Sequence, residues 1–548
     1  MGQPLDSASI YEVGLTSDGV YPAYYRFVEF PVLASKGVPL SSIRKFSGVQ
    51  ITYWLWLLIL VASPLASRGQ AHPDSASEGG QRQRSAEAAE AGNSSFPALL
   101  VSDIHFDPFH DPGKVRQLVD APVSQWGTIL SSPTSANQKA AFATLQQGCQ
   151  MRGVDTPYSL LRSSLQAVRS RQPDAKFMAV SGDLIAHAFS CRYMTLFPGS
   201  TPSDYQAFVL KTLSFVMGEL RASIPGVPVY VALGNNDTAC DDYRLDAGSE
   251  FLAQAGRIVA EGLPRSQREQ VIKGFAKGGY YSLTMAAPMR NTRLIVVNDL
   301  FLSPKYRTCA GKSDTTAATA QMVWLQEELA QARRLGQRVW VMGHIPPGID
   351  PYSTVARFKD VCGGEPPEMF LSSERLADLM MEYGDTIRLG IFAHTHMDEL
   401  RLLEPEDSDP RASQERNVAL KLVASISPVD GNNPSFTVAH IDRSTALLRN
   451  YEVIAASNQT GIDTTWSREY DYARTYHEAQ FSPSTVKKLI AEFESDGGAK
   501  MEASEQYIRN YFVGDRSSEL QPFWPLYVCA LANHTAKAFA ACVCPAGK

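Results

Sequence analysis

The chain has 548 residues, of which 44% are hydrophobic and 20% charged, and its formal net charge at pH 7 is −6. This is ordinary globular composition, and the length allows two or three domains. The negative charge argues against a general nucleic-acid binder, which needs a basic face, so we expect no nucleic-acid-binding surface. An anionic substrate stays open, because bound metal ions supply positive charge locally.

The N-terminal region contains one long apolar run, Ile51–Ala62. About twelve apolar residues are too few for a membrane-spanning helix but fit the core of a signal peptide. The fifty preceding residues are unusual for a signal peptide, so 1–50 is either a disordered N-terminal extension or the result of a start assigned too early. We predict a signal peptide or membrane anchor over 51–71, with 51–66 as the anchoring part in the second case, and a polar linker over 72–95.

From Phe96 onward, short runs rich in Val, Ile, Leu and Ala recur, which is typical of strands buried on both faces of a sheet. The expected strands are Ala98–Val101, Phe177–Val180, Val227–Ala232, Leu294–Val297, Val339–Met342, Leu389–Ala393 and Leu422–Ile426. Apolar residues at helical spacing predict helices over Tyr158–Arg171 and Thr315–Leu335. We therefore predict a layered α/β domain over 96–455.

After about residue 465 the strand pattern fades, and helical stretches over Pro483–Ser495 and Ala503–Tyr511 lead to a tail with cysteines. We predict a small helical C-terminal domain over 456–548. All eight cysteines follow the apolar run, at positions 149, 191, 240, 309, 362, 529, 542 and 544. An even set of this kind is typical of disulfides in an oxidising compartment, with buried free thiols as the alternative.

Five of the expected strands end in residues that can ligate metals. These ends read Asp103-Ile-His105, Gly182-Asp183, Gly234-Asn235-Asn236-Asp237, Gly343-His344 and His394-Thr-His396. Because the carboxyl ends of strands in an α/β sheet converge on one edge, we expect seven ligands to gather there. They are Asp103, His105, Asp183, Asn235, His344, His394 and His396. Each motif alone occurs by chance, but packing does not explain all five together.

These residue types match a site for two metal ions. Two divalent ions roughly 3.5–4 Å apart can clamp a phosphoryl group and generate a bridging hydroxide that attacks it. One carboxylate has to bridge the ions, and Asp183 is our candidate. Imidazole, carboxylate and amide ligands favour zinc, our first choice, or Mn, Fe or Co, over Mg or Ca.

The order of the motifs resembles that of the calcineurin-like metallophosphoesterases, across roughly residues 97–440. Three motifs are similar to the acid sphingomyelinase-like and endopolyphosphatase branch: Gly182-Asp183-Leu-Ile-Ala-His187, Gly343-His344-Ile-Pro-Pro-Gly348 and Ala393-His394-Thr-His396. The resemblance implies a four-layer α/β/β/α sandwich and a position for His187 near the leaving group. It also implies one metal at Asp103, His105 and His396, a second at Asn235, His344 and His394, and Asp183 between them.

One position departs from the family, whose common motif is Gly-Asn-His followed by Asp or Glu. This chain has Asn236 in place of that histidine, as endopolyphosphatases do. An asparagine can donate a hydrogen bond to a phosphate oxygen but cannot deliver a proton at neutral pH. We therefore expect His187 to protonate the leaving group, with Asp237 as an alternative acid. The competing interpretation makes His187 a structural residue at a strand end.

Together these features predict a secreted, periplasmic or otherwise extracytoplasmic hydrolase of phosphodiester or phosphoanhydride bonds. Its substrate would be a phosphate ester, polyphosphate or a membrane lipid such as sphingomyelin, and the sequence selects neither among these nor an oligomeric state. The alternative is a catalytically quiet phosphate-binding or surface-interaction protein on the same fold. Asn236 favours that alternative, whereas the intact ligand set opposes it.

Three cysteine pairings are expected. We expect Cys309 to join Cys362, because both follow segments that reach the rim of the site, and the family resemblance points the same way. The other expected pairs are Cys149 with Cys191, and Cys529 with either Cys542 or Cys544.

Overall fold

The computed structural model describes residues 95–406, 416–514 and 520–544. The expected N-terminal extension, the signal peptide or anchor and all but the last residue of the expected linker lie outside these ranges. No helix within them has the length and apolar character needed to cross a membrane.

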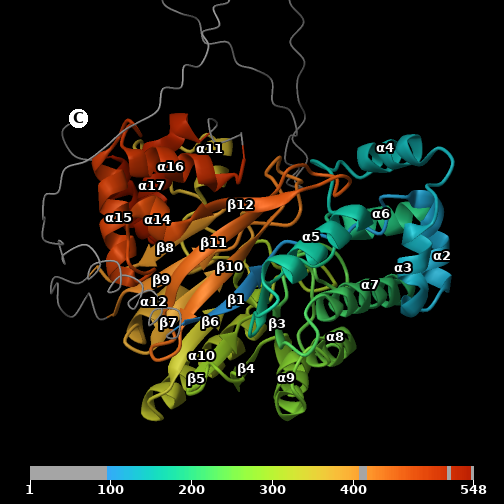
Figure 1. Cartoon of the computed structure of the whole chain (residues 1–548), viewed down its shortest axis with the longest axis horizontal. Helices are drawn as coiled ribbons and strands as arrows, with labels where there is room; N and C mark the ends of the chain where they lie inside the picture. Colours follow the sequence, from blue (N-terminus) through green and yellow to red (C-terminus); the bar gives the residue numbers. More distant parts are fainter. Residues whose placement is uncertain (1–94, 407–415, 515–519, 545–548) are drawn as a thin grey trace, which may run out of the picture. The chain divides into compact units, whose positions relative to one another are not determined.

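Two six-stranded β-sheets form the centre of the structure (Figure 1). In chain order, the first sheet contains β1 (Ser95–Val101), β2 (Met178–Ser181), β3 (Val229–Ala232), β10 (Ser435–Asp442), β11 (Leu448–Ala456) and β12 (Trp466–Asp471). The second contains β4 (Tyr281–Thr284), β5 (Thr292–Val296), β6 (Arg338–Met342), β7 (Ile387–Phe392), β8 (Glu399–Leu403) and β9 (Val418–Leu422). Strands β1, β2 and β3 are parallel to one another, as are β5, β6, β7 and β9, so each group of strands ends at one edge of its sheet.

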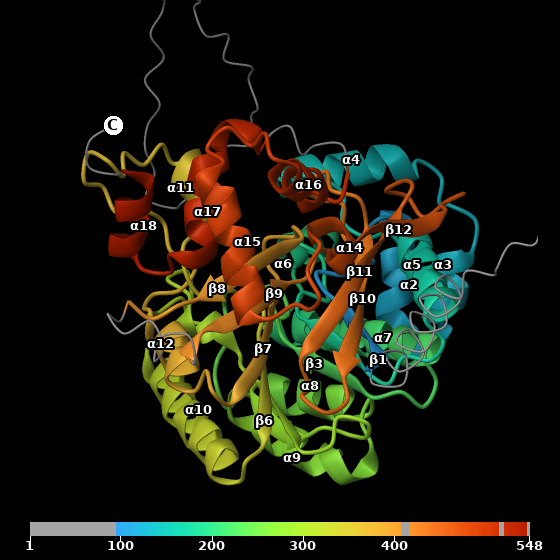
Figure 2. The same cartoon turned by 60° about the vertical axis from the view of Figure 1, so that its left-hand side comes forward.

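The two sheets pack face to face with helices outside them, which confirms the expected four layers (Figure 2). Helices α10 (Thr316–Arg334) and α12 (Arg375–Glu382) cover the outer face of the second sheet. Helices α5 (Tyr158–Arg171) and α7 (Pro202–Ser223) lie on the side of the first sheet. Before the C-terminal region, the described residues also form the α-helices α2 (Val115–Asp120), α3 (Trp126–Ser131), α4 (Gln138–Gly148), α6 (Phe189–Leu196), α8 (Glu250–Ala260), α9 (Arg265–Gly278) and α11 (Pro351–Ala356).

The continuous apolar runs of the sequence follow from this layering. In β6, Val339 and Val341 pack toward the α10 layer, whereas Trp340 belongs to the core between the sheets. The Trp340 ring lies 5.7 Å from that of Phe177, which precedes β2, in an edge-to-face contact. Since successive side chains of a strand alternate between faces, a strand buried on both faces has apolar residues at every position.

One expected strand is displaced. The run Leu422–Ile426 contributes only Leu422 to β9, and the rest of the run is a buried connection that bonds to the segments after β7 and β1. There Ser425 N–H donates to His396 O (3.1 Å) and Ser427 N–H donates to Asp103 O (3.0 Å). Burial keeps this connection apolar, which makes it indistinguishable from a buried strand in the sequence.

The first sheet continues beyond residue 455, because β12 pairs antiparallel with β11. Helices follow it: α14 (Tyr472–Tyr476), α15 (Pro483–Ser495), α16 (Glu502–Tyr511), α17 (Trp524–Ala532) and α18 (Ala536–Val543). They share one compact unit with the sheets, and α15 and α17 contact β8. Asp398, two residues after His396, donates its N–H to Tyr511 O (2.9 Å) at the end of α16.

The disulfides correct one expected pairing. Cys149–Cys191 and Cys529–Cys542 form as predicted. The predicted Cys309–Cys362 bond is wrong, because Cys309 joins Cys240 and Cys362 joins Cys544. The loop that carries Cys240 runs beside the loop of Cys309, where Leu245 N–H donates to Arg307 O (3.2 Å). The C-terminal tail meanwhile reaches back to the segment after α11, a contact that no sequence pattern indicates.

Candidate metal centre

The candidate ligands lie on strained backbone just beyond the strand ends. Five of the seven have positive φ angles: Asp103 (44°), His105 (43°), Asp183 (52°), His394 (73°) and His396 (64°). This conformation costs a non-glycine residue roughly 1–3 kcal/mol and persists only where the surroundings enforce it. The concentration of these strained residues at one edge indicates that the positions of their side chains are maintained at a cost in backbone conformational energy.

Asp103, His105 and His396 form one half of the centre. The Nε2 atoms of His105 and His396 lie 3.1 Å apart, and Asp103 Oδ1 lies 3.4 Å from His396 Nε2 and 3.8 Å from His105 Nε2. All three residues are buried. The ends of β1 and β7, 291 residues apart for the histidine pair, thus meet at one point.

Asn235, His344 and His394 form the other half. His344 Nε2 lies 3.1 Å from Asn235 Oδ1 and 3.3 Å from His394 Nδ1. Asp183 lies between the halves, with Oδ2 3.5 Å from His105 Nε2 and 3.2 Å from His344 Nε2. The structure therefore gathers all seven predicted ligands.

The hydrogen bonds around the two central histidines leave lone pairs facing inward. His105 Nδ1 lies 3.0 Å from Ile185 O and His344 Nδ1 lies 2.8 Å from Ser181 O. A carbonyl oxygen only accepts hydrogen bonds, so each Nδ1 carries the hydrogen and each neutral ring directs an Nε2 lone pair into the centre. Electron pairs from different strands converge there, which favours a cation.

Asp103 supports the same conclusion. Its carboxylate is fully buried, and within the described ranges neither oxygen accepts a hydrogen bond. A buried carboxylate without hydrogen bonds is costly unless a cation or proton compensates its charge. Two overlapping groups, Asp103/His105/Asp183 and Asp183/His344/His394, each have ligand atoms within 4.8 Å of one another and share Asp183. The aspartate and histidine clusters are thus compatible with a dinuclear metal site.

Outer residues hold the ligands in place. Asn235 Nδ2 donates to Asp242 Oδ1 (2.8 Å), which turns the amide oxygen toward His344. His396 Nδ1 lies 2.9 Å from Asp430 Oδ2, and Tyr243 Oη lies 3.3 Å from His394 Nε2. Partners of this kind fix the ring orientation and raise the basicity of metal ligands.

Asn236 and Asp237 both support the loops of the centre. Asn236 donates from N–H to Asp183 Oδ1 and from Nδ2 to Asp183 Oδ2, both at 2.8 Å. Asp237 is buried and accepts from the N–H groups of Leu184 (2.8 Å), Ile185 (3.1 Å) and Gly234 (3.0 Å). Burial and the nearby Asp183 raise the pKa of Asp237 to about 7. Asp237 thereby ties the Asp183 loop to the Asn235 loop.

His187 stacks on His105, with ring centroids 3.9 Å apart, and its side chain is 22% exposed. One ring nitrogen each of His105, His187 and His396 lie within 4.8 Å of one another. His187 Nδ1 lies 2.8 Å from Asp155 Oδ1, and its N–H donates to Asp155 Oδ2 (2.9 Å). Burial and His105 lower the pKa of His187 to about 4, while Asp155 opposes that shift.

A buried arginine completes this network. Arg192 pairs with Asp107 (2.9 Å) and Asp155 (3.1 Å), and all three side chains are inaccessible to solvent. Burial alone would raise the pKa of Asp155, but His187, His105 and Arg192 lower it below its ordinary value. Asp155 is therefore a carboxylate held in place to orient His187.

Sequence reasoning missed these supporting carboxylates, which are Asp155, Asp242, Asp299 and Asp430. Asp299 accepts the His344 N–H (2.7 Å) and is the one with a signal in the sequence, because it ends the Asn298-Asp299 pair after β5. The others lie in loops where an aspartate has many ordinary uses. Only the folded chain shows which of them meets a ligand.

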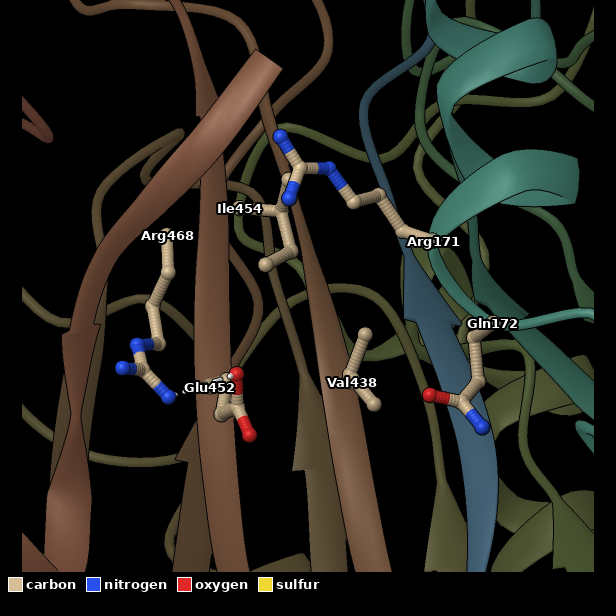
Figure 3. A pocket seen from close by; sticks show the side chains of 6 residues that line it. All are labelled: Arg171, Gln172, Val438, Glu452, Ile454 and Arg468. Atoms are coloured by element: carbon tan, nitrogen blue, oxygen red, sulfur yellow. Dashed lines mark hydrogen bonds and ion pairs between the residues drawn. The ribbon is translucent and has the colours of Figure 1, made fainter.

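A separate surface cavity of about 270 Å³ lies beside the C-terminal end of α5 and strands β10–β12 (Figure 3). Helix α5 begins beside the centre, where Thr156 N–H donates to His105 O (3.1 Å), and it is about 20 Å long. The cavity is thus remote from the ligands. Its charged side chains have partners: Glu452 pairs with Arg468 (3.4 Å), and Arg171 donates to Trp466 O. We assign it no part in the chemistry.

Comparison with known proteins finds similar chains among the phosphodiesterases. The cyclic GMP-AMP phosphodiesterase SMPDL3A of Mus musculus is 24% identical over 81% of this chain and 90% of its own length. The acid sphingomyelinase-like phosphodiesterase 3b of Mus musculus is 26% identical over 72% of this chain and 79% of its own length. A crystal structure of a dimetal phosphatase from Danio rerio aligns with 68% of this chain and 98% of that chain, at 14% identity and a TM-score of 0.35. The family model for calcineurin-like phosphoesterases matches residues 96–398, more than half of the chain, and the chain therefore belongs to this family of metal-dependent phosphoesterases.

Proposed function

We propose that this protein hydrolyses phosphodiester or phosphoanhydride bonds with two divalent metal ions held at the strand ends. The observation that carries the proposal is the position of Asp183 between two groups of inward-facing ligands, 3.5 Å from His105 and 3.2 Å from His344. A carboxylate with two oxygens can bridge two cations, and it belongs to both ligand groups.

We assign the first ion to Asp103, His105 and His396 and the second to Asn235, His344 and His394, with Asp183 as the bridge. Four imidazoles among these ligands favour zinc, with Mn, Fe or Co as alternatives. When bound, the ions would polarise the phosphoryl oxygens and lower the pKa of the attacking water. The buried aspartates would balance the charge of the ions.

The residues around the ligands have three further roles: binding of a phosphoryl oxygen, proton transfer to the leaving group and support of the loops. Asn236 Nδ2 lies at the bridging carboxylate and can turn its hydrogen bond toward a phosphoryl oxygen. His187 is positioned to give its proton to the departing oxygen, with Asp155 holding the ring. Asp237 is engaged by three backbone N–H groups, so we assign it to support of the loops rather than to proton transfer.

The names of the relatives support a phosphodiester substrate, since they include a cyclic GMP-AMP phosphodiesterase and a sphingomyelinase phosphodiesterase. Four disulfides fit an oxidising compartment, and we propose that the protein is exported. The complete ligand set opposes the alternative of a catalytically quiet phosphate-binding protein. A protein that had lost catalysis would have no need to keep seven ligand residues, five of them on strained backbone.

The test measures metal content and hydrolysis of bis-p-nitrophenyl phosphate by the purified protein. We expect two metals per chain in the native protein. Asp183→Asn should lose metal pairing and at least about 100-fold in turnover, because an amide bridges two cations poorly and even outer-shell changes cost 10–100-fold. Asp174→Asn, at an exposed aspartate, is the matched control. Two metals and normal turnover in Asp183→Asn would overturn the bridging assignment, and no turnover by the native protein would overturn the function.

A further inference from the structure

The loop before α5, residues 149–157, is fixed at both of its ends, and the second end bonds to a candidate metal ligand. Cys149 is bonded to Cys191 in α6, and Thr156 N–H donates to His105 O (3.1 Å). Between these points Gly153 packs so closely on Val429 O that a side chain would overlap it. The loop therefore holds its side chains at defined positions beside the ligands.

Arg152 carries a positive charge on this loop at the rim of the centre. Its Nη1 lies 3.8 Å from Asp430 Oδ1, and the other oxygen of Asp430 lies 2.9 Å from His396 Nδ1. The Arg152 side chain is 51% exposed. The same loop carries Asp155, which holds His187, so Arg152 lies on the side of the proposed proton donor.

The position of Arg152 relative to His187 indicates which part of a substrate Arg152 can contact. If His187 protonates the departing oxygen, the leaving group lies on the side of His187, and Arg152 is an exposed cation on the loop that holds this ring. The Arg152 side chain is half-exposed, so a ligand can reach its guanidinium from solvent. Guanidinium groups suit phosphate and carboxylate because their N–H donors match the geometry of these anions.

We propose that Arg152 determines specificity by binding a negative charge on the leaving group, such as a further phosphate. The proposal rests on the hydrolytic function proposed above. In the reaction, water supplies the oxygen that bonds to phosphorus, the bond from phosphorus to the leaving oxygen breaks, and Arg152 transfers no proton. Substrates whose leaving group is anionic are thereby preferred over those that release a neutral alcohol, such as a lipid.

The test uses two methyl aryl phosphodiesters that differ in one charge. One releases a phenol with a 4-carboxylate, and the other releases a phenol with a 4-carboxamide. We expect the native protein to hydrolyse both. In Arg152→Gln the loss of kcat/KM on the carboxylate substrate should exceed the loss on the carboxamide substrate by about 3- to 10-fold, mainly through KM, as a partly exposed charge contact predicts. Arg152→Lys should keep most of the preference.

A matched control replaces Arg169, an exposed arginine near the far end of α5, with glutamine and should leave the ratio unchanged. Equal losses on both substrates in Arg152→Gln, together with lower metal content, would show that Arg152 only supports Asp430 and His396, and would overturn the proposal. A native protein that hydrolyses both esters with no change of ratio in Arg152→Gln would also overturn it. Failure to hydrolyse either ester would instead refute the proposed function.

Discussion

At the residue scale, His187 has a buried aspartate on Nδ1 and stacks on the ring of His105, a candidate metal ligand. Asp155 fixes which nitrogen carries the hydrogen, so Nε2 is the atom that can exchange a proton. The low pKa of His187, about 4, follows from burial and from His105. The ring is therefore protonated below about pH 4 and loses that proton as the pH rises through this value.

This property predicts how His187→Ala acts. An alkoxide needs a proton to depart, whereas an activated aryl phenolate does not, so the variant should lose about 10²–10⁴-fold more on alkyl than on aryl diesters. The gap should widen toward acid pH, where the native ring is protonated, and shrink as the pH rises. Rates for both substrates across the pH range test this. A uniform loss at every pH would assign His187 to ligand support.

Asp155 and Asp107 offer a matched pair of variants, because both pair with Arg192 but only Asp155 contacts His187. Removing either carboxylate leaves a buried guanidinium with one partner fewer, so each Asp→Asn change should lower the free energy of unfolding by about 3–5 kcal/mol. Asp155 raises the pKa of His187, so only Asp155→Asn should lower the pH at which alkyl-diester hydrolysis begins to decline. Denaturant titration and pH profiles measure the two effects. An equal shift in Asp107→Asn would remove Asp155 from its orienting role.

At the element scale, the loops after the strands depend on glycine where two loops nearly touch. A Cβ at Gly343 would overlap Asp299 Oδ2 and lie 2.8 Å from Phe392 and 2.9 Å from Val297. Gly343→Ala should therefore shift the His344 loop, lower metal content and cost about 1–3 kcal/mol of stability. Gly148→Ala, in α4 with no atom near its would-be Cβ, should instead leave metal content unchanged and raise stability by up to about 1 kcal/mol. Full metal content in Gly343→Ala would contradict the close packing of these loops.

The burial of the elements and their place in the chain decide how much of the fold and of the site the sequence predicts. Strands such as β6 were predictable because both faces are buried, and the ligands because they directly follow strand ends. The strand predicted over Leu422–Ile426 was misplaced because a buried connection has the same composition as a buried strand. The roles of Asp155 and Asp430 could not be predicted, because the contact of an aspartate with a histidine far away in sequence leaves no local pattern.

At the scale of the whole molecule, two disulfides hold the C-terminal helices with loops of very different size. Cys362–Cys544 spans 182 residues, whereas Cys529–Cys542 spans 13. The entropy lost by the unfolded chain grows with loop length, so replacing both Cys362 and Cys544 by serine should cost about 2 kcal/mol more than replacing both Cys529 and Cys542. Thermal and denaturant unfolding of the two double variants compare them. A larger cost for the shorter loop would mean that local packing of the helices dominates.

The meeting of His105 and His396 across 291 residues also sets when the centre can exist during synthesis. A growing chain that ends before His394 lacks a ligand of each half, and one that ends before Asp430 lacks the partner that orients His396. Metal loading must therefore follow the docking of both sheets, a slow step because it depends on contacts distant in sequence. For a chain that crosses a membrane unfolded, the ions would then come from the compartment in which folding finishes, so metal supply there, rather than at the ribosome, would govern how much active protein forms.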